Sequence, residues 1–214
     1  MDIYGDHATC CKKGGDLITR HNSIRDLCDR IATEALLSPV MEKKGILGPT
    51  SGRRPADVLI PNWVGQDGLA IDFAVTCPVS KTNVKIESPC EDYAEVHKHR
   101  KYDVSFRGHP FLFTAVVFET LGAINVEGEL ALKQIFRFAA KRTGREFSSY
   151  CGRAWARFSC VLQRAVSQAI LTRTSGQPGP QSEEFTTTTP DPAPESEGEN
   201  NRKYPRDENP VPSR

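Results

Sequence analysis

Leu69-Ala70-Ile71-Asp72-Phe73-Ala74-Val75-Thr76 is an apolar stretch with one carboxylate at its centre, and it decides the fold. A short apolar run bounded by loop residues predicts a buried strand. A carboxylate inside such a strand is costly unless it is paired or coordinates a cation. Asp72 is therefore the strongest single candidate for a functional residue.

A second carboxylate lies fifteen positions upstream, where Asp57 opens the apolar run Asp57-Val58-Leu59-Ile60. Residues 61–68, which include Pro61 and Gly68, predict a turn, so the two runs form a hairpin. Its neighbouring strands can bring both carboxylates to one Mg²⁺ or Mn²⁺ ion. Such an ion can polarise a phosphodiester, deprotonate an attacking water and stabilise the leaving oxygen.

A cation is also expected near the scissile phosphate, to place the water or stabilise developing charge. Helical character from Glu91 to about Asp103 puts Ala94, Lys98 and Lys101 at i, i+4 and i+7. The small residue can pack on the sheet while both lysines lean over its edge. The spacing leaves open which lysine is catalytic. The alternative is that Asp57 is an ordinary turn residue and both lysines belong to a solvated face.

The remaining pattern predicts an α/β fold. A helix begins at Asn22 or Ser23 as cap and ends before Pro39, and its apolar stripe needs a sheet to lie on. Residues 110–118 are continuous enough in apolar residues to predict a central strand. Two helices follow, at 126–142 and 148–173. The order is helix, three- to four-stranded mixed sheet with a helix before its last strand, then two C-terminal helices.

Charge is unevenly distributed along the chain, although the net charge is only +1. Residues 175–214 are rich in Pro, Ser, Thr, Glu and Gly, which predicts a disordered tail. The body is mildly basic, and seven cations lie between positions 137 and 164 against one acid, Glu146. A basic face suits a polyanion such as DNA, whereas the plainer interpretation is a solvated helix surface. The seven are Arg137, Lys141, Arg142, Arg145, Arg153, Arg157 and Arg164.

The chain carries no sign of secretion or of a membrane span. Its seven cysteines lack a disulfide-framework rhythm, and the N-terminus has no apolar signal region. No apolar run approaches the roughly 18 residues of a membrane span. We expect a soluble nuclear or cytoplasmic protein. Residues up to about Gly15 are dense in Gly, Asp, His and Cys, and a metal is the natural candidate to hold them.

An ordered series of motifs resembles the restriction-endonuclease-like domain that follows the reverse transcriptase in site-specific non-LTR retrotransposons. The motifs, within residues 4–120, are Tyr4-Gly5-Asp6-His7 with Cys11, Arg20-His21-Asn22, Arg54-Pro55-Ala56-Asp57, Ala70-Ile71-Asp72 and Arg100-Lys101-Tyr102. The resemblance implies a PD-(D/E)xK nuclease fold, Mg²⁺, and nicking of target DNA to prime reverse transcription. It matches Asp57 and Asp72 to the family carboxylates, and Lys101 or Lys98 to the family lysine.

The chain departs from the common nuclease pattern at two positions. Ala74 stands where that pattern has a lysine, so the lysine must come from the helix, as it does in the retroelement branch. Ala56 separates Pro55 from Asp57, which leaves the register of Asp57 open.

The family also places a zinc knuckle before this domain, and such a site needs four ligands. The resemblance leaves only His7 and Cys11 (or Cys10) for it, so we expect a chain that begins inside the motif and holds Zn²⁺ poorly. The other interpretation is an N-terminus without metal. An upstream reverse transcriptase is absent from this sequence, and DNA, with element RNA as a further possibility, is the expected partner.

The sequence thus predicts a zinc-knuckle remnant at 1–19, a restriction-endonuclease-like core at 20–122, basic helices at 123–174 and the tail at 175–214. The residues expected to contact nucleic acid are Arg20, His21, Arg142, Arg145, Arg153 and Arg157, although Arg20 and His21 can equally pack at the helix start or meet a carboxylate. Two functions compete with the nuclease. One is a catalytically inactive nucleic-acid-binding remnant, and the other is a host protein that keeps the fold for interaction.

Overall fold

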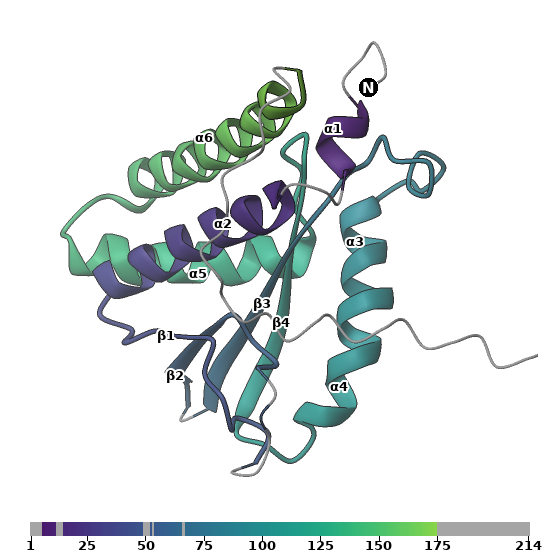
Figure 1. The fold of residues 1–214 in the computed structure, drawn as a ribbon. Helices are drawn as coiled ribbons and strands as arrows, with labels where there is room; N and C mark the ends of the chain where they lie inside the picture. The colour runs from purple at the N-terminus through teal and green to yellow at the C-terminus, as the bar shows by residue number, and fades with distance from the viewer. Residues whose placement is uncertain (1–5, 12–14, 49–51, 53, 66, 175–214) are drawn as a thin grey trace, which may run out of the picture. The chain divides into compact units, whose positions relative to one another are not determined.

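A computed structural model of the chain describes residues 6–11, 15–48, 52, 54–65 and 67–174. In these residues one mixed four-stranded sheet has the order β1-β2-β3-β4 (Figure 1). The strands are β1 (Val40–Met41), β2 (Val58–Val64), β3 (Asp67–Thr76) and β4 (Phe111–Glu119). The predicted tail at 175–214 and much of the predicted zinc-knuckle remnant lie outside the described residues.

The predicted hairpin is present, because β2 pairs with β3 antiparallel and Val58 lies opposite Ile71. The predicted turn is too wide. β2 continues through Pro61 to Val64, with an irregularity in the ladder between Ile60 and Val64. Proline is tolerated there because β1 pairs with β2 only at Val58 and Leu59, so the missing N–H of Pro61 faces no partner strand.

The strand predicted at 110–118 is β4, but its predicted central position is wrong. β4 pairs in parallel with β3 and lies at one edge of the sheet (Figure 1). Its apolar character has another cause: helices cover both of its faces, which is the usual burial of a parallel strand. Asn125 covers part of the outer edge, since its side chain accepts from Val117 N at 2.8 Å and donates to Ala115 O at 3.0 Å.

Side chains along β3 alternate between two cores. Leu69, Ile71 and Phe73 pack into the larger core, which is formed with α2 (Asp16–Glu34), α5 (Val126–Arg142) and α6 (Phe147–Thr174). Ala70 and Ala74 face the other side, where α3 (Pro89–Tyr93), η1 (Ala94–His99) and α4 (Arg100–Phe106) form a continuous helical arm (Figure 1). The alternation places Asp72 on the side of this helical arm.

The helix predicted from Asn22 begins earlier, at Asp16, after the left-handed Gly15. The first turns of α2 were not predicted because polar contacts, and not an apolar stripe, hold them in place. Arg20 is 3% exposed, and its Nη1 donates to Thr9 O at 2.9 Å. Asp16 forms an ion pair with Arg173 near the end of α6.

The helices predicted at 126–142 and 148–173 are confirmed as α5 and α6. The helix predicted from Glu91 to Asp103 is also present, but its middle, η1, is a π-helix. Among the helices that the structure describes, none is long and apolar enough to cross a membrane.

Candidate functional site

Asp57 lies just before β2, where the ladder between β2 and β3 ends. Its own N–H donates to Ile71 O at 2.8 Å. Two residues further along β3, the N–H of Phe73 donates to Asp57 Oδ2 at 2.6 Å. The carboxylate thus takes the place of the missing backbone partner, which fixes its position against the centre of β3.

The other carboxylate oxygen of Asp57 meets α2. His21 Nε2 lies 3.2 Å from Asp57 Oδ1. Burial alone would raise the pKa of Asp57, but the hydrogen bonds from His21 and Phe73 outweigh it and bring the pKa below its ordinary value. Burial likewise works against the charge of His21, yet Asp57 holds the His21 pKa above its ordinary value. Asp57 is therefore an ionised and well-anchored carboxylate.

Asp72 faces the helical arm, where the ammonium of Lys98 contacts its Oδ2 as an ion pair. The two side chains are 11% and 15% exposed. Burial raises the pKa of Asp72 to about 6, against the opposing effect of Lys98 and with a smaller contribution from the charge of Asp57. Burial would lower the pKa of Lys98, but Asp72 holds it above its ordinary value. The pair carries opposite charges at neutral pH.

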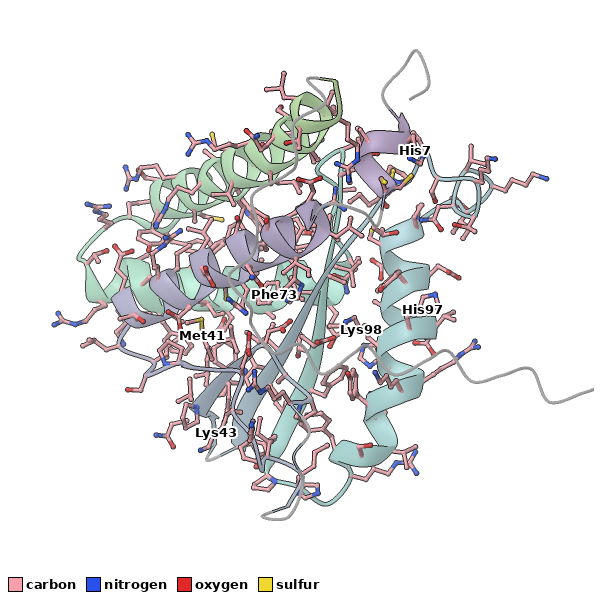
Figure 2. The ribbon with its side chains drawn as sticks, in the orientation of Figure 1. His7, Met41, Lys43, Phe73, His97 and Lys98 are labelled. Carbon is pink, nitrogen blue, oxygen red and sulfur yellow. The ribbon has the colours of Figure 1, made fainter. Side chains whose placement is uncertain are left out.

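Lys98 lies on the side of the helical arm that faces the strands, and His97 lies further out (Figure 2). Ala94 is buried against β3 and β4, as its spacing predicted. Lys101 is exposed, and its Nζ lies 5.0 Å from the ring centroid of Tyr102. Lys98 and Lys101 face different directions because of the π-helix. Its wider turn takes up roughly one extra residue and rotates later side chains by about 100°.

His21, Asp57, Asp72 and Lys98 are together called the Asp72 cluster below. The charges of Lys98 and His21 act on both aspartates, and the charge of Asp57 raises the pKa of Asp72. Within the described ranges, no set of three or more His, Cys, Asp or Glu side chains is arranged to hold a metal ion. A divalent ion at the Asp72 cluster would take two carboxylates, with water, phosphate or main-chain oxygens completing its shell.

This composition fits Mg²⁺ or Mn²⁺ and not Zn²⁺. Magnesium is commonly held by one or two carboxylates plus waters and substrate phosphates, whereas zinc prefers Cys and His. Asp72 Oδ2 is buried, and the ammonium of Lys98 is its contact among the described residues. A buried oxygen with spare acceptor capacity suits a hard cation.

The residues expected to hold zinc lie elsewhere. His7 and Cys10 belong to α1 (Asp6–Cys10), with Cys11 directly after it, and Figure 2 shows His7 at the end of the molecule away from Lys98. Cys10 Sγ donates to His7 O at 3.6 Å. These side chains take no part in the Asp72 cluster.

The residues expected to contact nucleic acid are divided between several places. Arg20 is buried at the start of α2, as in the alternative that it packs there. His21 contacts Asp57, as in the alternative that it meets a carboxylate. Four arginines are exposed at the end of α5, in the loop before α6 and along α6, on the side of the sheet opposite the helical arm (Figure 1): Arg142, Arg145, Arg153 and Arg157. Arg157 lies 3.8 Å from Glu34, and no described acid pairs with the other three.

Two features of the site were not predicted from the sequence. One is the N–H of Phe73, a main-chain group for which no side-chain pattern exists. The other is His99, whose Nδ1 lies 2.9 Å from Asp103 and whose Nε2 lies 2.7 Å from Glu127 at the start of α5. His99 ties the helical arm to α5 next to Lys98. Its spacing of four from Asp103 was the available signal.

Comparison with protein-family models, curated proteins and solved structures finds no match for this chain.

Proposed function

We propose that the chain is a metal-dependent DNA endonuclease domain of the restriction-endonuclease-like class, of the kind that nicks target DNA in non-LTR retroelements. The observation that carries the proposal is the buried carboxylate of Asp72, which lies in the centre of β3 with Lys98 against it and Asp57 electrostatically coupled to it. Burial of such a charge is costly, and buried carboxylates with shifted pKa values gather at functional sites.

Asp57 and Asp72 are the residues that would hold Mg²⁺ or Mn²⁺. When bound, the ion supplies a Lewis acid that polarises the phosphodiester and stabilises the leaving oxygen. Asp57 is preset for this role because His21 and the Phe73 N–H fix both of its oxygens while each keeps a second lone pair. Lys98 presents the ammonium that orients the attacking water or faces the developing charge on the phosphate.

The test is nicking of supercoiled plasmid by the full chain with Mg²⁺ or Mn²⁺. Asp72→Asn keeps the size of the side chain and removes its charge, so nicking should fall at least about a hundredfold. Asp92→Asn is the matched control, because Asp92 is an exposed aspartate on α3. Equal nicking by wild type and Asp72→Asn, or nicking that survives EDTA, would overturn the proposal.

A second candidate is a nucleic-acid-binding module without catalysis. It is favoured by the exposed basic residues Arg142, Arg145 and Arg153, which no described acid neutralises. Salt-sensitive DNA binding with intact plasmid under all metal conditions would select this function over the nuclease.

A further inference from the structure

The ion pair between Lys98 and Asp72 shows how the chain itself offsets the negative charge of a carboxylate in the Asp72 cluster. Two carboxylates lie in a largely buried place, and two side chains of the chain itself offset them. His21 does so at Asp57 and Lys98 at Asp72. Each carboxylate thus already has a side-chain partner from the chain itself, without any bound ion.

Lys98 contacts Asp72 Oδ2, one of the carboxylate oxygens available to a divalent ion at the Asp72 cluster. Asp72 Oδ2 is buried, and the ammonium of Lys98 is in contact with it. Two cations at one carboxylate oxygen repel strongly in a place with little water. A bound ion at Oδ2 therefore disfavours the observed position of Lys98.

We propose that Lys98 is a built-in competitor of the metal: it holds Asp72 in the metal-free protein and must leave Oδ2 when a divalent ion binds. This inference rests on the proposed metal site and deepens it. Lys98 holds the Asp72 carboxylate in place before the ion arrives. It also lowers the metal affinity of the site, so that appreciable occupancy requires a higher concentration of the ion.

The arm gives Lys98 the freedom that this exchange requires. A lysine side chain has four methylene groups, so its ammonium can leave Oδ2 while the helix stays in place. The helix itself is held, because His99 contacts Glu127 on α5 and Ala94 is buried against the sheet. The released ammonium stays on the side of the arm that faces β3, within reach of a phosphate.

The experiment measures Mn²⁺ binding to the full chain without DNA, by calorimetry or by the loss of the free-ion signal in electron paramagnetic resonance. Lys98→Met removes the charge and keeps a similar volume. It should bind Mn²⁺ about tenfold more tightly than wild type, whereas Lys98→Arg, which restores a cation, should not. Lys101→Met is the matched control for an exposed lysine of the same arm and should bind as wild type does. Asp72→Asn should lose the binding.

A second readout is thermal stability. In EDTA, Lys98→Met should melt at a lower temperature than wild type because Asp72 has lost its counter-ion. Saturating Mn²⁺ should raise its melting temperature by more than that of wild type.

The outcomes separate this inference from the proposed nuclease. Mn²⁺ binding that depends on Asp72 but is equal or weaker in Lys98→Met overturns the competition and leaves the nuclease standing. Binding that is the same in wild type and Asp72→Asn overturns both. Tighter binding by Lys98→Met, combined with weaker nicking, supports both.

Discussion

His21 Nε2 lies 3.2 Å from Asp57 Oδ1, although the two residues are 36 positions apart. Phe73 N lies 2.6 Å from Asp57 Oδ2, so α2 and β3 hold the carboxylate of Asp57 from two directions. A carboxylate held in this way needs no rearrangement before it acts.

Replacing His21 should therefore loosen Asp57. We expect His21→Ala to lower nicking about tenfold and to reduce the free energy of unfolding by about 1–3 kcal/mol, because a buried carboxylate loses a partner. His21→Gln, whose amide can donate to Asp57, should recover much of the loss. Plasmid nicking and urea unfolding measure the two effects. His97→Ala, which alters an exposed histidine on the arm, should change neither, and equal losses in both alanine variants would contradict this role.

The two lysines of the arm should differ sharply in activity. Lys98→Ala removes the ammonium at Asp72 and should lower nicking on the order of a hundredfold. Lys101→Ala removes an exposed side chain next to Tyr102 and should change nicking less than about twofold. Initial rates at saturating Mn²⁺ make the comparison independent of metal affinity. The reverse order of effects would assign the role to Lys101.

The sequence was sufficient for the hairpin, for the strand that carries Asp72, for the strand that begins directly after Asp57 and for the last two helices. Asp72 was identifiable because a charge inside an apolar strand is conspicuous. The sequence could not decide between Lys98 and Lys101. The π-helix changes the direction in which later side chains of the helical arm point, and no residue pattern near either lysine indicates a π-helix. An α-helical wheel places both on one face.

The wrong expectations have a common physical origin. β4 was expected in the centre of the sheet because apolar residues indicate burial, but burial by helices and burial by strands look alike in sequence. The start of α2 was missed because Asp16 and Arg20 are held by polar partners distant in the chain. Apolar periodicity records neither kind of contact.

His99 should make stability depend on pH. Burial opposes its charge, but Asp103 and Glu127 hold its pKa above the ordinary value. The cation therefore stabilises the folded state fully below the ordinary pKa of about 6.5, and this contribution is lost as pH rises through the higher folded value. His99→Gln should cost about 0.5–1 kcal/mol at pH 5.5 and less at pH 8.5, by urea unfolding. A cost that grows with pH would contradict the assignment.

Two helical glycines offer a matched pair of substitutions. A Cβ on Gly128 in α5 would lie 2.5 Å from Asn125 Oδ1 and 3.0 Å from Val116 Cα, whereas a Cβ on Gly152 in α6 meets nothing within 4 Å. Gly128→Ala should destabilise the protein by about 1–3 kcal/mol through overpacking. Gly152→Ala should stabilise it by about 0.5–1 kcal/mol through helix propensity. Thermal or urea unfolding gives both signs, and the same sign in both variants would be inconsistent with this packing.

The basic face of α6 predicts salt-dependent binding of nucleic acid. If Arg145 and Arg153 each contact a phosphate, the double change to Gln should lower the slope of log affinity against log salt by about 2. Fluorescence anisotropy of a labelled duplex measures it from low to physiological salt. Lys81 and Lys85, exposed in the loop before α3, are changed to Gln as the control pair. Equal slopes in wild type and the arginine variant would identify this face as a solvated helix surface.

Asn125 uses one side-chain amide to satisfy groups that a fifth strand would otherwise take, Val117 N and Ala115 O, and its own N–H donates to Val117 O at 3.1 Å. An exposed strand edge is a template on which another chain can add itself. By closing the second half of β4 with a side chain that belongs to the following loop, the protein protects itself against self-association in this direction. We expect loss of the Asn125 amide to promote self-association at high concentration, although this residue contacts neither aspartate.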